Sequence, residues 1–299
     1  MRSRVLHAAQ ILLGLAVTLF VVRYVSRNWN EVQSAHLAWH VSAGPLISAL
    51  VVIWAVFAIQ AESWRRMVAG WGYDLPWIEG SAVWLLSSMA KYVPGKVWSL
   101  AGMAVMSERR GVPAWVSTAS AILLQVVSLG TGALVVAVFG VAISRTVSIA
   151  AAAVAVVVVG LALWKPLVVR VVARVAPGAD LKHFPPAPVI LFGVLANLAA
   201  WLGYGVAFWL FARGVLPQSA PGLAESVGAY TASYVAGVIA PFAPGGLGVR
   251  EGVLVMALRD HTGLAPALAF AAVARLGMTV AEVIAAIPFL LRRRESLRA

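Results

Sequence analysis

Long apolar runs dominate this chain and constrain its fold more than any other feature. Of its 299 residues, 62% are hydrophobic and only 11% are charged, whereas soluble domains are about 45–50% apolar and about 25% charged. A helix needs about 20 apolar residues to cross the hydrocarbon core of a bilayer. We therefore predict one all-α polytopic membrane domain over residues 1–299. The composition excludes a soluble enzyme, a disordered chain and a nucleic-acid-binding domain.

Six apolar runs are candidates for full membrane spans. They are Val5–Tyr24, Pro45–Ala61, Ala114–Ile143, Thr146–Trp164, Val189–Phe211 and Ala265–Leu291. The first follows Arg2 and Arg4, as the apolar part of a signal peptide would. Because no small-residue cleavage site is evident after it, we interpret it as a retained helix.

Two further apolar regions, Ile78–Ser107 and Ser226–Leu258, are each interrupted near the middle by Pro-Gly. Their arms of about 12–17 residues would reach roughly 18–25 Å as helices. The shorter arms fall below the ~30 Å thickness of the hydrocarbon core. We therefore expect two re-entrant helical hairpins beside six full spans, although hydropathy alone would give about eight to ten spans.

The distribution of positive charge predicts the orientation. With six spans and two hairpins, 14 of the 23 Lys and Arg residues fall in one set of loops and five in the opposite set. The positive-inside rule then puts both termini in the cytoplasm, for a multi-pass protein of the cytoplasmic (inner) membrane. The remaining four cations fall within the membrane region: Lys91, Lys96, Arg250 and Arg275.

The two interrupted regions resemble each other at an offset of 150 residues. The twenty-residue segments that begin at Ala90 and Ala240 agree at seven positions, among them the Pro-Gly pair and a closing Met-x-x-Arg. Each half follows the order span, span, hairpin, span, which predicts an inverted-topology repeat of residues 1–143 and 144–299. Transporters with this arrangement bind substrate near the midplane beside broken helices. The alternative is a structural array of helices whose Pro kinks have no function.

The strongest local signal is PGGLGVREG, which begins at Pro244. A proline there ends the incoming helix, and the three glycines permit a tight turn. These glycines are Gly245, Gly246 and Gly248. The outgoing helix would present unpaired N–H groups to an anion, and Arg250 would clamp a phosphate. Glu251 would hold an arginine in place or exchange a proton.

Other charges within the apolar regions complete the candidate site. Lys91 and Lys96 flank Pro94-Gly95 in the first hairpin, although a lysine in a short arm can also snorkel to an interface. Arg275 and Glu282 lie seven residues apart, so they share one helical face. For Glu282, a structural ion pair with Arg275 or with the second hairpin is an equal alternative. Four cations against two anions leave a positive surplus that an anionic substrate would balance.

Some polar residues have ordinary structural interpretations. We expect Glu62 to pair with Arg65 or Arg66, and Asn197 and Gln125 to form hydrogen bonds across helices. The five His show no ligand spacing and the chain has no Cys. We therefore expect no metal, no cofactor, no catalytic residues and no enzymatic activity.

Three of these features together carry a family resemblance. KYVPGKVW, APGGLGVREG and the helix with Arg275 and Glu282 resemble the transmembrane-region family of lysylphosphatidylglycerol synthases, over roughly Val5 to Leu291. In multidomain members this region is the flippase module, and a soluble synthase domain follows it. The resemblance implies a stand-alone lipid translocator without the synthase domain.

The leading hypothesis is a translocator that moves a phosphate-bearing lipid between leaflets. Its partner would be a membrane phospholipid or a polyprenyl-phosphate lipid and not a nucleic acid. A homo-oligomer and an association with an envelope-synthesis enzyme stay open. Two alternatives remain, which are a secondary carrier for a small anion and an accessory or enzymatic subunit of a lipid-linked sugar pathway.

Overall fold

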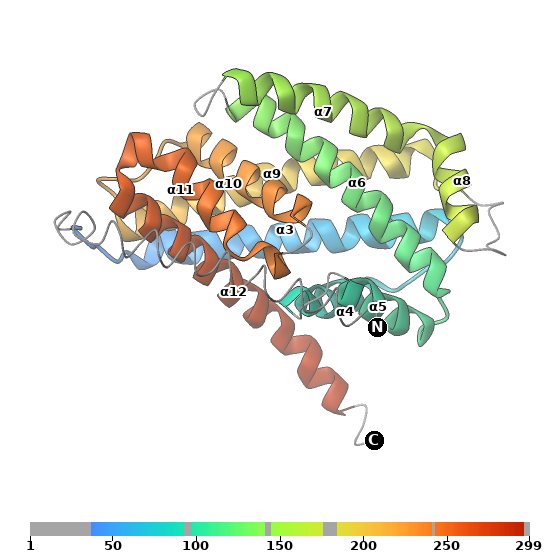
Figure 1. Ribbon diagram of the computed structural model, residues 1–299. Coiled ribbons are helices and arrows are strands. Elements are labelled where there is room, and N and C mark those ends of the chain that lie inside the picture. Colours follow the sequence, from blue (N-terminus) through green and yellow to red (C-terminus); the bar gives the residue numbers. More distant parts are fainter. Residues whose placement is uncertain (1–36, 93–96, 141–144, 176–183, 241–242, 296–299) are drawn as a thin grey trace, which may run out of the picture.

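The computed structural model describes residues 37–92, 97–140, 145–175, 184–240 and 243–295, and in these ranges every regular element is helical (Figure 1). The α-helices are α3 (Ala43–Gly70), α4 (Trp77–Ser88), α5 (Val97–Glu108), α6 (Ala114–Phe139), α7 (Arg145–Leu163), α8 (Lys165–Val175), α9 (Ala187–Val215), α10 (Leu223–Ile239), α11 (Val249–Thr262) and α12 (Leu264–Glu295). Two 3₁₀ turns, η1 (Met89–Tyr92) and η3 (Pro244–Gly246), complete the described structure.

Four of these helices are long and apolar enough to cross a membrane, namely α3, α6, α9 and α12. Their apolar segments have 26 to 29 residues, more than the minimum of about 20. Each contains or closely matches one of the predicted spans, so a long apolar helix is confirmed at these four places. Helix α7 coincides with the predicted span Thr146–Trp164 and has 19 residues. The predicted first span, Val5–Tyr24, lies outside the described residues.

The two Pro-Gly regions form two pairs of short helices, as the sequence predicts. Helices α4 and α5 pack together on either side of η1, and α10 and α11 pack together on either side of η3. Three arms have 12 to 14 residues, and α10 has 17. Figure 1 shows α10 and α11 side by side, with α12 crossing below them toward α4.

Glycines bring the helices of the bundle into close contact. Helix α9 packs against α3, α6, α10 and α12. A Cβ on Gly203 would lie 2.5 Å from Val56 of α3, and one on Gly205 would lie 2.5 Å from Val227 of α10. On α12, Gly277 similarly lies against the ring of Phe211. Small residues at such contacts are typical of helix packing in membranes, where backbones gain van der Waals contact by close approach.

Two of the polar interactions predicted from the sequence are observed, one at the end of α3 and one inside the bundle. Glu62 accepts hydrogen bonds from both Arg65 and Arg66, at 2.7 and 2.6 Å. Asn197 accepts a hydrogen bond of 3.4 Å from Gln60 of α3. The side chain of Gln125 is exposed on α6, so the prediction for it stays untested among the described residues.

Candidate functional site

Helix α12 carries the two charged side chains that connect the interrupted helices. Glu282 is only 2% exposed, and its carboxylate accepts a hydrogen bond from the ammonium of Lys91 in η1. Arg275 donates a hydrogen bond of 3.0 Å to the backbone carbonyl of Gly245 in η3. Arg275 also lies 3.7 Å from Glu251. One helix therefore contacts the interruption in both hairpins.

The turn between α10 and α11 has the backbone that its glycines predict. Gly245, Gly246 and Gly248 have φ angles of 57°, 71° and 78°, a region that side chains disfavour and glycine tolerates. The chain can therefore reverse within a few residues and begin α11 at Val249. Any other residue at these three positions would strain the turn.

The start of α11 differs from the expected open anion site. Glu251 accepts a hydrogen bond of 2.7 Å from the backbone N–H of Gly248, so a carboxylate of the same helix already caps this end. The N–H groups of a helix end and its positive dipole favour a negative charge, and Glu251 supplies one. The sequence predicted that an anion would be favoured here, but not that Glu251 would take this place.

Arg250 passes between two glycines before it reaches the bundle interior. A Cβ on Gly237 of α10 or on Gly246 of η3 would overlap the Cγ of this arginine. Beyond this slot, Nη2 of Arg250 donates a hydrogen bond of 3.1 Å to the hydroxyl of Tyr230. The guanidinium lies over the ring of Tyr234, 4.3 Å from its centre. The position of the charge thus depends on the absence of side chains at Gly237 and Gly246.

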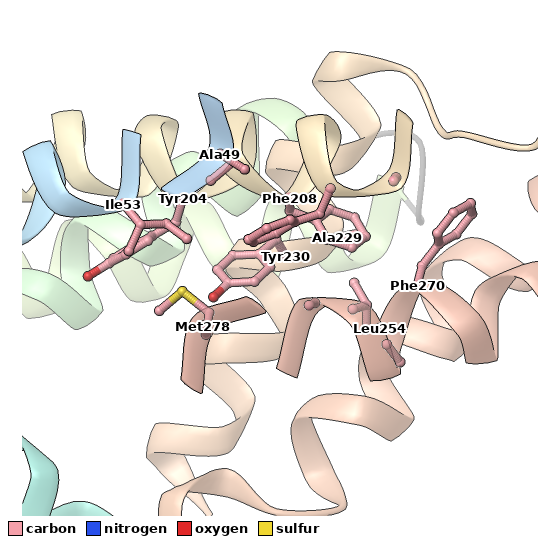
Figure 2. Packing of buried hydrophobic residues seen from close by; sticks show 14 of the residues in the cluster. Ala49, Ile53, Tyr204, Phe208, Ala229, Tyr230, Leu254, Phe270 and Met278 are labelled. Atoms are coloured by element: carbon pink, nitrogen blue, oxygen red, sulfur yellow. The ribbon is translucent and has the colours of Figure 1, made fainter. Parts of the chain in front are cut away.

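An aromatic cluster from α9 and α10 surrounds this guanidinium, and the sequence analysis missed it. Tyr204 stacks on Tyr234, with 6.3 Å between ring centres and 9° between ring planes, and Phe208 stacks on Tyr230 at 5.7 Å. Figure 2 shows Tyr204, Phe208 and Tyr230 together, across from Leu254 and Met278. The signal available in the sequence is the spacing of four within both pairs, Tyr204/Phe208 and Tyr230/Tyr234, which puts each pair on one helical face.

Three of the charged groups line one small pocket of about 10 Å³. Its walls include Tyr230, Ser233, Arg250, Glu251 and Arg275. This volume holds about one water molecule, so a phosphate could enter only after the helices move apart. A larger cavity, of about 390 Å³, lies between the loop after α9 and the start of α12, and its lining residues carry no charge.

The structure therefore gathers most of the predicted site residues. Three cations and two carboxylates meet around η1, η3 and α12 among the described residues: Lys91, Arg250, Arg275, Glu251 and Glu282. Pro94, Gly95 and Lys96 lie outside the described residues. Of the alternatives for Glu282, an internal ion pair is observed, and it joins Glu282 to Lys91 of the first hairpin.

Comparison with known proteins gives one family. The family model described as the lysylphosphatidylglycerol synthase TM region matches residues 11–286. None of the curated proteins matches the sequence.

Proposed function

The chain belongs to the family of the lysylphosphatidylglycerol synthase transmembrane region, and from this premise we propose that it moves a phosphate-bearing lipid between the leaflets of the membrane. The observation that carries the proposal is the meeting of three cations and two carboxylates at two helix interruptions inside an apolar helical bundle. Ionisable groups at membrane depth are costly, and they typically line a pathway or bind a charged ligand.

The charge of this group favours an anionic substrate. Lys91, Arg250 and Arg275 exceed Glu251 and Glu282 by one positive charge among the described residues, and Lys96 would add a second. A phosphate matches both the arginine forks and the lysine ammonium. The acyl chains of a lipid would remain among the apolar side chains that the outer faces expose, such as Val156 and Leu276, at 75% and 66% exposure.

The packing supports an inverted repeat with two re-entrant hairpins. In this scheme α3 corresponds to α9, α6 to α12, and the α4–α5 pair to the α10–α11 pair. The contacts agree with this correspondence. Helix α6 packs against α10 of the second hairpin, and its counterpart α12 packs against α4 of the first hairpin. The turns η1 and η3 also touch each other, as two hairpin tips near a common midplane would. With the predicted first span and α7, the protein would have six full spans, both termini in the cytoplasm and a place in the inner membrane.

The described arrangement corresponds to a closed state. Because the cavity beside Arg250 and Arg275 has room for about one water, substrate binding requires α12 to separate from a hairpin. Transport needs no bond to be made or broken, and we assign no catalytic residue and no cofactor. Membrane lipid would then be the principal partner of the protein.

Leaflet exchange in liposomes tests the proposal. Purified protein would be reconstituted with headgroup-labelled phosphatidylglycerol, and dithionite quenching would follow movement of the label between leaflets. We expect fast exchange with wild type and slow exchange with Arg250→Ala. The matched control is Arg213→Ala, since Arg213 lies at the end of α9 over the Trp209 ring, away from the site. Exchange no faster than in empty liposomes, with or without imposed pH and potential gradients, would overturn lipid translocation.

The same liposomes distinguish lipid translocation from the small-anion alternative. Uptake of radiolabelled inorganic phosphate without lipid exchange would identify a small-anion carrier. A glycosyltransferase that co-purifies with the protein, together with neither activity, would instead favour an accessory role in a lipid-linked sugar pathway.

A further inference from the structure

The ion pair between Lys91 and Glu282 is strongly asymmetric. The Glu282 side chain is 3% exposed, whereas the Lys91 side chain is 30% exposed. An approaching anion can therefore reach the ammonium while the carboxylate stays covered by protein. The side chain of Lys91 is also more exposed than that of Arg275, the other cation paired with a carboxylate in this site, which is 19% exposed.

The pair also joins the two halves of the chain. Lys91 belongs to η1 in the first hairpin, and Glu282 belongs to α12, 191 residues later. If this contact opens, α12 loses a charged link to the first hairpin while its link to the second hairpin, through Arg275 and Gly245, can persist. The contact is thus placed where a change of partner would remove the charged link between α12 and the first hairpin.

A lipid phosphate and a carboxylate offer a lysine the same chemistry. Both are anions with oxygen acceptors, and a lysine ammonium has three donors and no geometric fork that would select one over the other. Exchanging one anion for another on Lys91 avoids leaving a cation without a counter-charge at membrane depth. Exchange therefore spares the lysine, though not Glu282, the cost of losing its counter-charge, and so costs less than simply breaking the pair.

We propose that Glu282 occupies the place on Lys91 that the phosphate of the substrate takes during transport. This inference rests on the proposed function and deepens it. Lys91 is then a headgroup-binding residue, and Glu282 is a competitor built into the protein that closes the site when no headgroup is bound. Arrival of the phosphate displaces Glu282 and frees α12 from the first hairpin, and departure of the phosphate restores the pair.

Two variants of the full chain test the exchange, and they differ only at position 91. The first is Glu282→Gln, which removes the competing charge and keeps the side-chain shape. The second is the double variant Lys91→Met, Glu282→Gln, which replaces the whole pair with uncharged groups of similar volume. Replacing a buried pair in this way commonly preserves folding. Thermal unfolding in detergent would confirm that both variants fold.

Binding to the detergent-purified proteins would be measured by calorimetry with two probes, short-chain phosphatidylglycerol and inorganic phosphate. We expect Glu282→Gln to bind short-chain phosphatidylglycerol roughly tenfold more tightly than wild type, which corresponds to about 1.4 kcal/mol. The double variant should fold but lose this gain and bind more weakly than wild type. If both variants bind equally, or if Glu282→Gln binds no more tightly than wild type, the pair is merely structural and the inference is overturned.

The two probes keep this inference distinct from the proposed function. The same pattern with inorganic phosphate alone, in a protein that exchanges no lipid, would support anion exchange at Lys91 and overturn lipid translocation. Normal lipid exchange by wild type and the double variant would support translocation and overturn the role of Lys91. Absence of binding of either probe by all three proteins would overturn the inference.

Discussion

Gly237 on α10 and Arg250 on α11 lie so close that a Cβ at Gly237 would overlap the Cγ of the arginine. The arginine stem fills the space that a side chain would take, and its charge reaches the tyrosines beyond. Position 237 therefore controls where the guanidinium of Arg250 lies, although it carries no functional group itself.

Gly237→Ala should displace Arg250 and slow lipid exchange. Overpacking of this kind typically costs about 1–3 kcal/mol, more than the gain of roughly 0.5–1 kcal/mol that alanine brings to a helix interior. The thermal unfolding temperature in detergent and the exchange rate in liposomes should both fall. Gly252→Ala on α11 is the matched control, because a Cβ there meets nothing within 4 Å. Equal unfolding temperatures and exchange rates for the two variants would show that Arg250 does not depend on the absence of a side chain at Gly237.

The two partners of the Lys91–Glu282 pair should respond differently to neutralisation. Lys91→Met takes the ammonium partner from a carboxylate that is 3% exposed, a change that costs about 3–5 kcal/mol in buried pairs. Glu282→Gln leaves a lysine that is 30% exposed and can extend toward a polar environment, so its cost should be clearly smaller. Thermal unfolding of the two single variants measures the difference, and a larger loss for Glu282→Gln would refute it.

The ring of Tyr234, rather than its hydroxyl, should hold Arg250. A guanidinium over an aromatic face gains about 0.5–2 kcal/mol, and the distance to the ring centre is 4.3 Å. Tyr234→Phe keeps the face and should retain most of the exchange activity. Tyr234→Leu removes it and should lower both unfolding temperature and exchange. If Tyr234→Phe were as impaired as Tyr234→Leu, the hydroxyl would be the important group.

The proposed orientation predicts which loops react with a membrane-impermeant thiol reagent. The chain has no cysteine, so single cysteines can be introduced without background. Asp74 follows α3 and Gln218 follows α9, and both are exposed. In intact cells Gln218→Cys should be labelled, and Asp74→Cys should be labelled only after permeabilisation. The reverse pattern would place both termini outside the cytoplasm.

Sequence patterns were sufficient for the parts of the fold that depend on local chemistry. Apolar length located α3, α6, α9 and α12, because an uninterrupted run of this kind can satisfy its backbone only as a helix in the membrane. Pro-Gly located both helix interruptions, since proline removes a backbone donor and glycine permits the positive φ angles seen at Gly245 and Gly246.

Which charged residues pair with each other in the site was harder to predict from the sequence. The ionisable members could be identified because they interrupt apolar runs, yet the partner of Glu282 proved to be Lys91, 191 residues away. Such a contact depends on how hairpins and helices pack, which spacing along one helix does not encode. The tyrosines escaped notice for a related reason, since aromatic residues in apolar segments are common and acquire a role only beside Arg250.

Helix α12 meets α9 at Gly277, which lies against Phe211, between Arg275 on one side and Glu282 on the other. A close contact of this kind can act as a pivot for a stiff helix. If α12 tilts about Gly277, Arg275 and Glu282 move in opposite directions relative to α9, so a gap that opens at the first hairpin is accompanied by closer contact at the second. Under the proposed function, one rocking helix would then present the site alternately to the two leaflets, with no need for either hairpin to unfold.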